Sequence, residues 1–338
     1  MKSKFKDFSV AQLFFQSRLY RWGASWMKRI YFTDRELSLY LIVAIFFKKL
    51  NNNDLPIKAS AVAFSFTLAI FPAILFVFTL VPYLPIQDLR EQIFTFLDEL
   101  SPNSMNETIR ETVVDIISKP RGNLLSFGFL SALFLASNGV NALIDAFNSC
   151  YHGSLKKRNF FQKRMVATAL TFLLSSILFL TIVALISGRL ILDTLVGYNL
   201  LDENYIYYLI NVVRYLVVIL MFFAGTSVLY YFAPSIPSRW NFLSPGSVIA
   251  TTLIVLFSIA FSFYIDNFAT YNKLYGSIGV MLGVMLWLLA ISYVLLIGFE
   301  VNSTIDMARD RLKQLQDEME ASINSDWSPS PWRGTRRD

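Results

Sequence analysis

The residues of this chain that could do chemistry are polar side chains embedded in long apolar stretches. The first set of candidates consists of Asn138, Asn141, Asp145, Asn148, Glu300 and Asn302. The first four follow one another at helical spacing, so most of them share one face of a helix, and the last two close a later apolar stretch. Polar groups inside a membrane are costly, and each one is by default a hypothesis of function. Two interpretations stay open: a substrate-binding pocket that opens to the cytoplasm, or hydrogen bonds that join helices.

A second set of polar residues falls at the opposite ends of the apolar stretches. It consists of Arg189, Asn211, Arg214, Asp266, Lys273 and Tyr275. Arginines near the end of a span often extend along the helix to reach lipid headgroups. The alternative for Arg214 is a buried cation that binds an anionic headgroup or pairs with Asp266. This set is the outer candidate site.

Two residues could act as hinges. Pro72 lies in the middle of the first apolar stretch, where it predicts either a tolerated kink or the broken helix that borders a transporter site. Gly139 lies inside the polar set of the second stretch and permits close packing of two helices.

Enzyme signatures and metal ligands are absent from the sequence. The single cysteine, Cys150, and the single histidine, His152, cannot form a zinc cluster, and Cys150 has no partner for an intramolecular disulfide. Phosphate-binding loops, dinucleotide glycine motifs and serine-hydrolase motifs are also missing. We therefore expect no catalytic residue, no metal and no cofactor, and a nuclease is disfavoured.

The elements that carry these residues are membrane-spanning helices. Hydrophobic residues make up 55% of the 338 residues and charged residues only 16%, against about 25% charge in an average soluble domain. About 20 apolar residues are needed for a helix to cross the bilayer, and six stretches reach that length. The predicted spans are about 59–82, 124–144, 165–188, 206–233, 242–265 and 276–299. We predict an all-α polytopic membrane protein.

The basic residues predict the orientation of these spans. Of the 30 lysines and arginines, 23 lie before the first span, between spans two and three, between four and five, or after span six. The positive-inside rule places both termini in the cytoplasm. The net charge of +6 then reflects topology and attraction to anionic headgroups rather than nucleic-acid binding. We expect no removable signal peptide.

The segments that flank the spans complete the predicted organisation. Residues 1–58 should hold amphipathic interfacial helices, about 8–32 and 34–50, the second opened by a Thr33–Glu36 capping box. Residues 59–306 form the spanning domain, with an external helical hairpin at 83–123. Residues 307–338 should form a cytoplasmic tail. A charged helix over 301–323 continues from the last span into this tail, and the final residues should be disordered.

Several motifs resemble those of a known family. They are Lys58-Ala-Ser-Ala-Val-Ala-Phe, Phe71-Pro72, Asn141-Ala-Leu-Ile-Asp-Ala-Phe-Asn148, Ser-Pro-Gly-Ser at 244–247, Phe261-Ser-Phe-Tyr264, Tyr271-Asn-Lys-Leu-Tyr-Gly-Ser-Ile-Gly279, Leu286-Trp287 and Ile297-Gly-Phe-Glu-Val-Asn302. Together they are similar to the YihY/BrkB family of bacterial inner-membrane proteins over about residues 30 to 305. The resemblance implies six spans and cytoplasmic termini. Some members carry the name ribonuclease BN, and serum resistance and the handling of lipid or lipopolysaccharide are suggested for the family.

Two function classes follow from these observations. The first is a transporter or flippase of an amphiphilic, anionic envelope lipid or a related molecule, which the intramembrane polar residues favour. The second is a membrane scaffold or envelope-integrity factor that does not transport, which the absence of an ATP-binding or ion-coupling motif favours. The expected partners are membrane lipids and anionic headgroups, with a homo-oligomer or an envelope partner as further possibilities.

Overall fold

The computed structural model describes residues 31–32, 37–52, 54–83, 115–116, 119–151, 153–197, 203–236, 240–267 and 277–326. Within these ranges the chain is helical apart from two short strands and the connecting turns. It divides into two compact units, Asp54–Glu300 and a second unit that combines Met1–Asn53 with Val301–Asp338. The predicted external hairpin at 83–123 and most of the predicted helix at 8–32 fall largely outside the described residues.

The first unit is built from long helices. They are α4 (Leu55–Leu80), continued by the 3-10 turn η1 (Val81–Tyr83), α7 (Gly122–Cys150), α8 (Phe160–Gly197), α9 (Glu203–Phe232), α10 (Pro245–Asn267) and the part of α12 (Ser277–Asp326) that ends at Glu300. Six helices of the described chain have the length and the apolar composition needed to cross a membrane, which confirms the all-α fold with six candidate spans.

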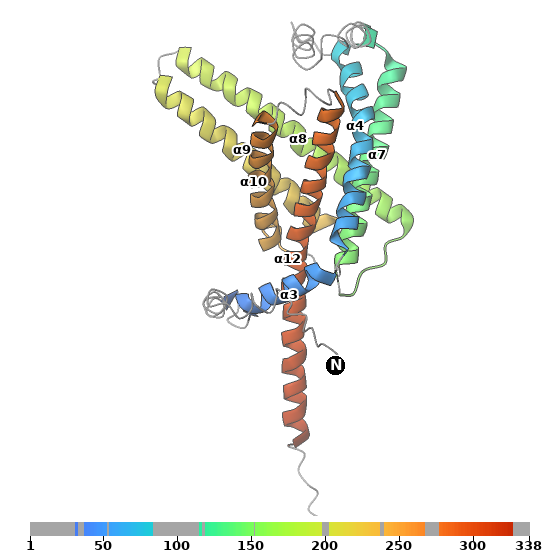
Figure 1. Ribbon diagram of the computed structural model, residues 1–338, viewed down its shortest axis with the longest axis vertical. Helices are drawn as coiled ribbons and strands as arrows, with labels where there is room; N and C mark the ends of the chain where they lie inside the picture. Colours follow the sequence, from blue (N-terminus) through green and yellow to red (C-terminus); the bar gives the residue numbers. More distant parts are fainter. Residues whose placement is uncertain are drawn as a thin grey trace, which may run out of the picture. The chain divides into compact units, whose positions relative to one another are not determined.

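Successive helices of this unit run in opposite directions, so their ends gather on two sides (Figure 1). α4 packs against α7, α7 against α8, α8 against α9, and α9 against α10. We use "basic end" for the side where α4, α8 and α10 begin and where α7 and α9 end, because Lys58, Arg158, Lys163 and Arg164 lie there. The "apolar end" is the opposite side.

The helices extend beyond the apolar stretches that predicted them. α4 begins at Leu55 rather than at residue 59, with Pro56 in its first turn, where the missing N–H of proline costs nothing. Lys58, expected in the flanking segment, therefore lies inside the first spanning helix. α4 also continues through Pro72, the candidate hinge, with helix on both sides of it. α8 starts five residues before the predicted span and runs on to Gly197.

The start of α10 explains the Ser-Pro-Gly-Ser motif. The backbone N–H of Ser247 donates to the Ser244 side-chain oxygen at 3.2 Å, and the backbone N–H of Ser244 donates to Oγ of Ser247 at 3.2 Å. These reciprocal bonds form a capping box, with Pro245 in the first helical position. The motif is therefore a structural element that fixes the beginning of α10.

Two glycines allow helices to approach closely. A Cβ atom on Gly139 would lie 2.7 Å from the ring of Phe66, so this candidate hinge lies where α7 packs on α4. A Cβ atom on Gly298 would lie 2.7 Å from Cβ of Ala250 and 2.8 Å from the carbonyl oxygen of Gly246. α12 therefore crosses α10 at a distance that a side chain at position 298 would prevent.

The second unit contains β1 (Tyr31–Phe32), β2 (Leu37–Ser38), α3 (Leu39–Asn52) and residues 301–326 of α12. The strands pair antiparallel, with Tyr31 opposite Ser38 and Phe32 opposite Leu37. The buried ammonium group of Lys49 donates to Oγ of Ser303 at 2.9 Å and so joins α3 to α12.

Two predictions for this unit need correction and one is confirmed. The helix expected over 34–50 begins only at Leu39, because the backbone of Leu37 and Ser38 pairs with β1 instead of starting a helix. The helix expected over 8–32 does not include residues 31 and 32, which form β1, since aromatic residues suit a strand well. The charged helix expected over 301–323 is confirmed as the continuation of α12 to Asp326.

Candidate functional site at the basic end

The predicted polar face of α7 lies at the basic end, and its members differ in exposure. Asn138, Asn141 and Asn148 are half-buried, whereas Asp145 is exposed. The side chain of Asp145 keeps 59% of its surface accessible in the protein alone. The face is therefore a boundary between the helices and their surroundings rather than a fully enclosed cluster.

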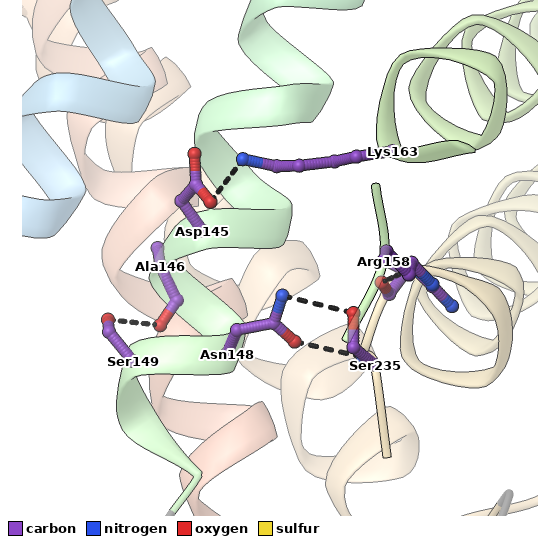
Figure 2. Close-up of polar contacts among 8 residues, drawn as sticks. Asp145, Ala146, Asn148, Ser149, Arg158, Lys163 and Ser235 are labelled. Carbon is purple, nitrogen blue, oxygen red and sulfur yellow. Dashed lines mark hydrogen bonds and ion pairs between the residues drawn. The ribbon is translucent and has the colours of Figure 1, made fainter. Parts of the chain in front are cut away.

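Basic residues of α8 bind this face. Lys163 forms an ion pair with Asp145 (Figure 2), and Arg164 donates to the side-chain oxygen of Asn138. Arg164 also donates to the backbone carbonyl of Phe134 at 3.3 Å and lies 4.4 Å above the ring of the same residue. A guanidinium held by an oxygen and an aromatic face is well satisfied. These contacts favour the interpretation in which polar groups join helices.

Asn148 joins α7 to the connection between α9 and α10. The backbone N–H of Ser235 donates to Oδ1 of Asn148 at 2.8 Å, and the amide nitrogen of Asn148 donates to Oγ of Ser235 at 3.3 Å (Figure 2). The backbone N–H of Lys156 donates to the Ser235 carbonyl at 2.7 Å. The loop after α7 and the loop after α9 are thus bound to each other.

Arg158 strengthens the same junction. Its guanidinium donates to the carbonyl oxygens of Phe232, Ala233 and Pro234 at 3.3, 2.8 and 3.0 Å. The last carbonyls of a helix lack partners within the helix and carry partial negative charge, so a cation there is stabilising. Arg158 therefore caps the C-terminus of α9.

A third polar group of the basic end is buried and joins three helices. Glu300 of α12 has no exposed surface, and the thiol of the buried Cys150 at the end of α7 hydrogen-bonds with its carboxylate. The ammonium group of Lys58, in the first turn of α4, donates to the same sulfur, with 3.6 Å between Nζ and Sγ. A carboxylate and an ammonium group thus share one thiol, and each offsets part of the cost of removing the other charge from water.

Aromatic rings pack around Phe299, the residue before Glu300 in α12. The rings of Phe147 and Phe299 stack with their centroids 4.5 Å apart, and Tyr230 and Trp240 contact the Phe299 ring with centroids at 6.2 and 5.1 Å. The Tyr230 hydroxyl donates to the Leu295 carbonyl at 2.8 Å. These contacts pack Phe147 of α7 and Tyr230 of α9 against α12 at the basic end.

The structure therefore divides the first candidate set among different partners. Asp145 contacts Lys163 on an exposed face, whereas Glu300 contacts Cys150 in the buried interior. Asn302 is buried and belongs to the second unit. Asn141 is half-buried on α7.

The outer candidate set lies toward the apolar end. Arg189 is in α8, Asn211 in α9 and Asp266 in α10, and Arg214 is exposed on α9. Exposure of Arg214 fits an arginine that reaches lipid headgroups. Lys273 and Tyr275 fall outside the described residues.

Sequence analysis did not select Lys58 or Cys150. Lys58 appeared only as the first residue of a family motif, and Cys150 was considered only as a possible disulfide or metal ligand. The two residues are 92 positions apart in the chain, so no local spacing could bring them together. The signal that could have found them is the position of both residues next to the polar ends of apolar stretches.

The described ranges hold no group of three or more histidine, cysteine, aspartate or glutamate side chains that could bind a metal ion. The basic end instead offers cations, amides and one buried carboxylate. Such a set can bind and orient an anion.

Comparison with known proteins agrees with this architecture. The sequence profile of the family described as virulence factor BrkB matches residues 46–322. The chain belongs to the BrkB family. The matched region includes every described spanning helix of this BrkB protein together with α3 from residue 46 and most of the charged part of α12.

Individual relatives span almost the same length. A Bacillus subtilis protein, YfkH, whose name describes it as ribonuclease-like, is 31% identical over 268 residues, which cover 77% of this chain and 92% of YfkH. A UPF0761 membrane protein of Actinobacillus pleuropneumoniae is 23% identical and covers 82% of this chain and 98% of its own. A UPF0761 membrane protein of Haemophilus influenzae is 22% identical, and the match covers 82% of this chain and 100% of the relative. No solved structure matches the chain.

Proposed function

We propose that this BrkB-family protein moves an amphiphilic, anionic envelope lipid or a related molecule across the bacterial inner membrane. The observation that carries the proposal is a group of cations and amides at one end of a bundle whose helices present exposed apolar side chains along their middle parts. The cations and amides gather at the basic end. A lipid has the same division between its headgroup and its acyl chains.

The apolar half of the bundle supports this proposal. Large side chains are exposed there on three helices: Leu178, Phe179, Ile182, Val212, Leu216, Leu220, Leu256, Ile259 and Phe263. In water such surfaces would drive association, but in a bilayer acyl chains cover them. α8 and α9 also diverge from α4 and α7 toward this end (Figure 1). Acyl chains of a substrate would therefore meet surfaces like those of the surrounding lipid.

The basic end supplies the complementary headgroup contacts. Lys163 and Arg164 border the exposed face of α7, and Lys58 lies beside the buried Cys150. Cations at a membrane interface attract anionic headgroups, by about 1 kcal/mol each. Membrane lipids are therefore the proposed partners.

The proposed orientation places the basic end and both termini in the cytoplasm. An even number of spanning helices returns the chain to the side from which it started, so Asp54 and Glu300 lie at the same end of the unit. The positive-inside rule assigns that end to the cytoplasm.

A non-transporting scaffold is the second candidate, because α12 continues as a charged helix. Residues 309–311 and 313–322 of this helix are exposed. Such a surface suits the recruitment of a protein partner. A ribonuclease has less support, since the described residues contain no group of three or more histidine, cysteine, aspartate or glutamate side chains that could bind a metal ion.

Reconstitution into vesicles separates the two candidates. Purified protein is inserted into phosphatidylcholine vesicles that contain tail-labelled fluorescent phosphatidylglycerol, and dithionite is added to bleach the outer leaflet. A transporter makes inner-leaflet label accessible, so bleaching exceeds that of protein-free vesicles. Heat-inactivated protein is the control. Bleaching equal to that of protein-free vesicles, with folded protein present, contradicts transport and favours the scaffold.

A further inference from the structure

We propose that Lys58 is the residue that binds the anionic headgroup, and that the headgroup takes the place of Cys150 around the Lys58 ammonium group. The inference rests on the proposed function and names a binding residue for it. The ligand is a lipid whose headgroup presents phosphate or carboxylate oxygens.

Among the four basic side chains of this end that hold an acceptor in the described structure, Lys58 differs from Arg158, Lys163 and Arg164 in the kind of acceptor. Lys163 contacts a carboxylate, Arg164 contacts an amide oxygen and a carbonyl, and Arg158 contacts three carbonyl oxygens. Among the residues that the structure describes at this end, the hydrogen bond of the Lys58 ammonium group goes to sulfur. Thiol sulfur is a weak acceptor, whereas an ionised phosphate or carboxylate oxygen is a strong one.

Exchange of partners therefore costs less at Lys58 than at Lys163, Arg164 or Arg158. A phosphate oxygen that replaces the thiol provides Lys58 with a stronger acceptor. A headgroup that displaced Arg158 from its three carbonyl oxygens would instead leave the end of α9 without its cap.

The position of Lys58 allows an anion to reach it. Its side chain is half-buried in the first turn of α4, and the neighbouring Pro56, Ile57 and Ser60 are exposed. Ile57, next to Lys58, retains 70% of its surface. A headgroup at the interface can therefore approach the ammonium group from the surface of the bundle without unfolding a helix.

Glu300 sets the affinity of this site. Its buried carboxylate shares the Cys150 thiol with Lys58, so it competes with the headgroup for the positive charge and repels the incoming anion. Removal of that negative charge in Glu300→Gln should strengthen headgroup binding. Loss of the Lys58 charge should weaken it.

The test measures equilibrium binding of phosphatidylglycerol to purified protein in detergent, with native mass spectrometry as the readout. Lys58→Gln should weaken binding by about tenfold, which is the usual scale for loss of one well-placed charged contact. Lys157→Gln removes an exposed lysine at the same end and is the matched control, with binding expected to stay within about twofold of wild type. Glu300→Gln should tighten binding severalfold.

Further arms keep the test decisive. Lys58→Arg keeps the charge and should retain most of the binding, so a fold defect in Lys58→Gln can be recognised. Equal binding by Lys58→Gln and Lys157→Gln overturns the proposal. Inorganic phosphate that binds as tightly as the lipid, or phosphatidylcholine that binds as tightly as phosphatidylglycerol, overturns the assignment to an anionic headgroup.

The outcome is independent of the transport assay, because binding in detergent requires no movement across a membrane. Protein that binds through Lys58 but moves no lipid in vesicles contradicts only the proposed function. Equal lipid movement by the wild-type protein and by the Lys58→Gln variant contradicts only the role of Lys58.

Discussion

Asn148 and Ser235 form a reciprocal pair in which each residue donates one hydrogen bond to the other. The two residues are 87 positions apart and join the end of α7 to the loop after α9. Asn148→Ala removes both bonds and leaves the Ser235 N–H without an acceptor. Hydrogen bonds between helices in membranes are worth about 0.6 kcal/mol on average and up to about 1.7, so we expect a loss of about 1 kcal/mol in unfolding free energy.

The matched control for Asn148→Ala is Asn141→Ala, because Asn141 is also half-buried on α7. Unfolding in mixed detergent micelles measures the loss of unfolding free energy in each of the two variants. A larger loss in Asn141→Ala than in Asn148→Ala would show that the reciprocal pair does not stabilise the junction.

Gly139→Ala should destabilise the packing of α7 on α4. The added methyl group would lie 2.7 Å from the Phe66 ring, and overpacking of this kind costs about 1–3 kcal/mol. Gly225→Ala is the opposite case, since its nearest atom, on Leu174, is at 3.7 Å and alanine is the better helix former. Melting temperatures of the two variants should therefore move in opposite directions, and a fall of equal size in both would contradict the assigned close approach.

The ion pair between Asp145 and Lys163 should contribute little to stability. The Asp145 side chain is 59% exposed, and pairs at such positions are worth about 0.2–1 kcal/mol. Asp145→Asn should change the unfolding free energy by no more than about 1 kcal/mol. Transport lost in Asp145→Asn at unchanged stability would support a role of this residue in the substrate path, whereas transport and stability lost together would exclude it.

The orientation can be tested with alkaline-phosphatase fusions. A fusion after Glu203, the first residue of α9, should be active, because the proposed orientation places the start of α9 outside the cytoplasm. Fusions after Lys157 and after Arg311 should be inactive, because the proposed orientation assigns both positions to the cytoplasmic side. Activity at Arg311 would imply an odd number of spans.

The name of the relative YfkH calls for a direct assay of RNA cleavage. We expect purified protein to show no metal-dependent cleavage above background, because no cluster of metal ligands is present in the described ranges. Cleavage that persists through stringent purification and disappears when one carboxylate is changed would overturn this expectation.

Sequence alone predicted the helices well, because uninterrupted apolar stretches are a strong local signal. It was less accurate at the helix ends. Pro56 extends α4 back to Leu55, and pairing of Leu37 with Phe32 delays α3 to Leu39. Such boundaries depend on single residues and on pairing, which hydrophobic patterning does not report.

The candidate site was predicted only in part. The polar residues of α7 were found because helical spacing places them on one face, but their partners, such as Ser235, come from distant parts of the chain. The contact of Lys58 with Cys150 depends on how α4 packs on α7. No spacing in one sequence contains that information.

The cap that Arg158 provides for α9 also constrains how the protein is made. A ribosome synthesises Arg158 before the three carbonyl groups that it binds at residues 232–234. The guanidinium can therefore reach its acceptors only after residues 232–234 have left the ribosome. The Arg158 cap therefore forms only after the end of α9 has been synthesised. Chains stalled before residue 232 should leave the loop between α7 and α8, which carries Arg158, accessible to protease.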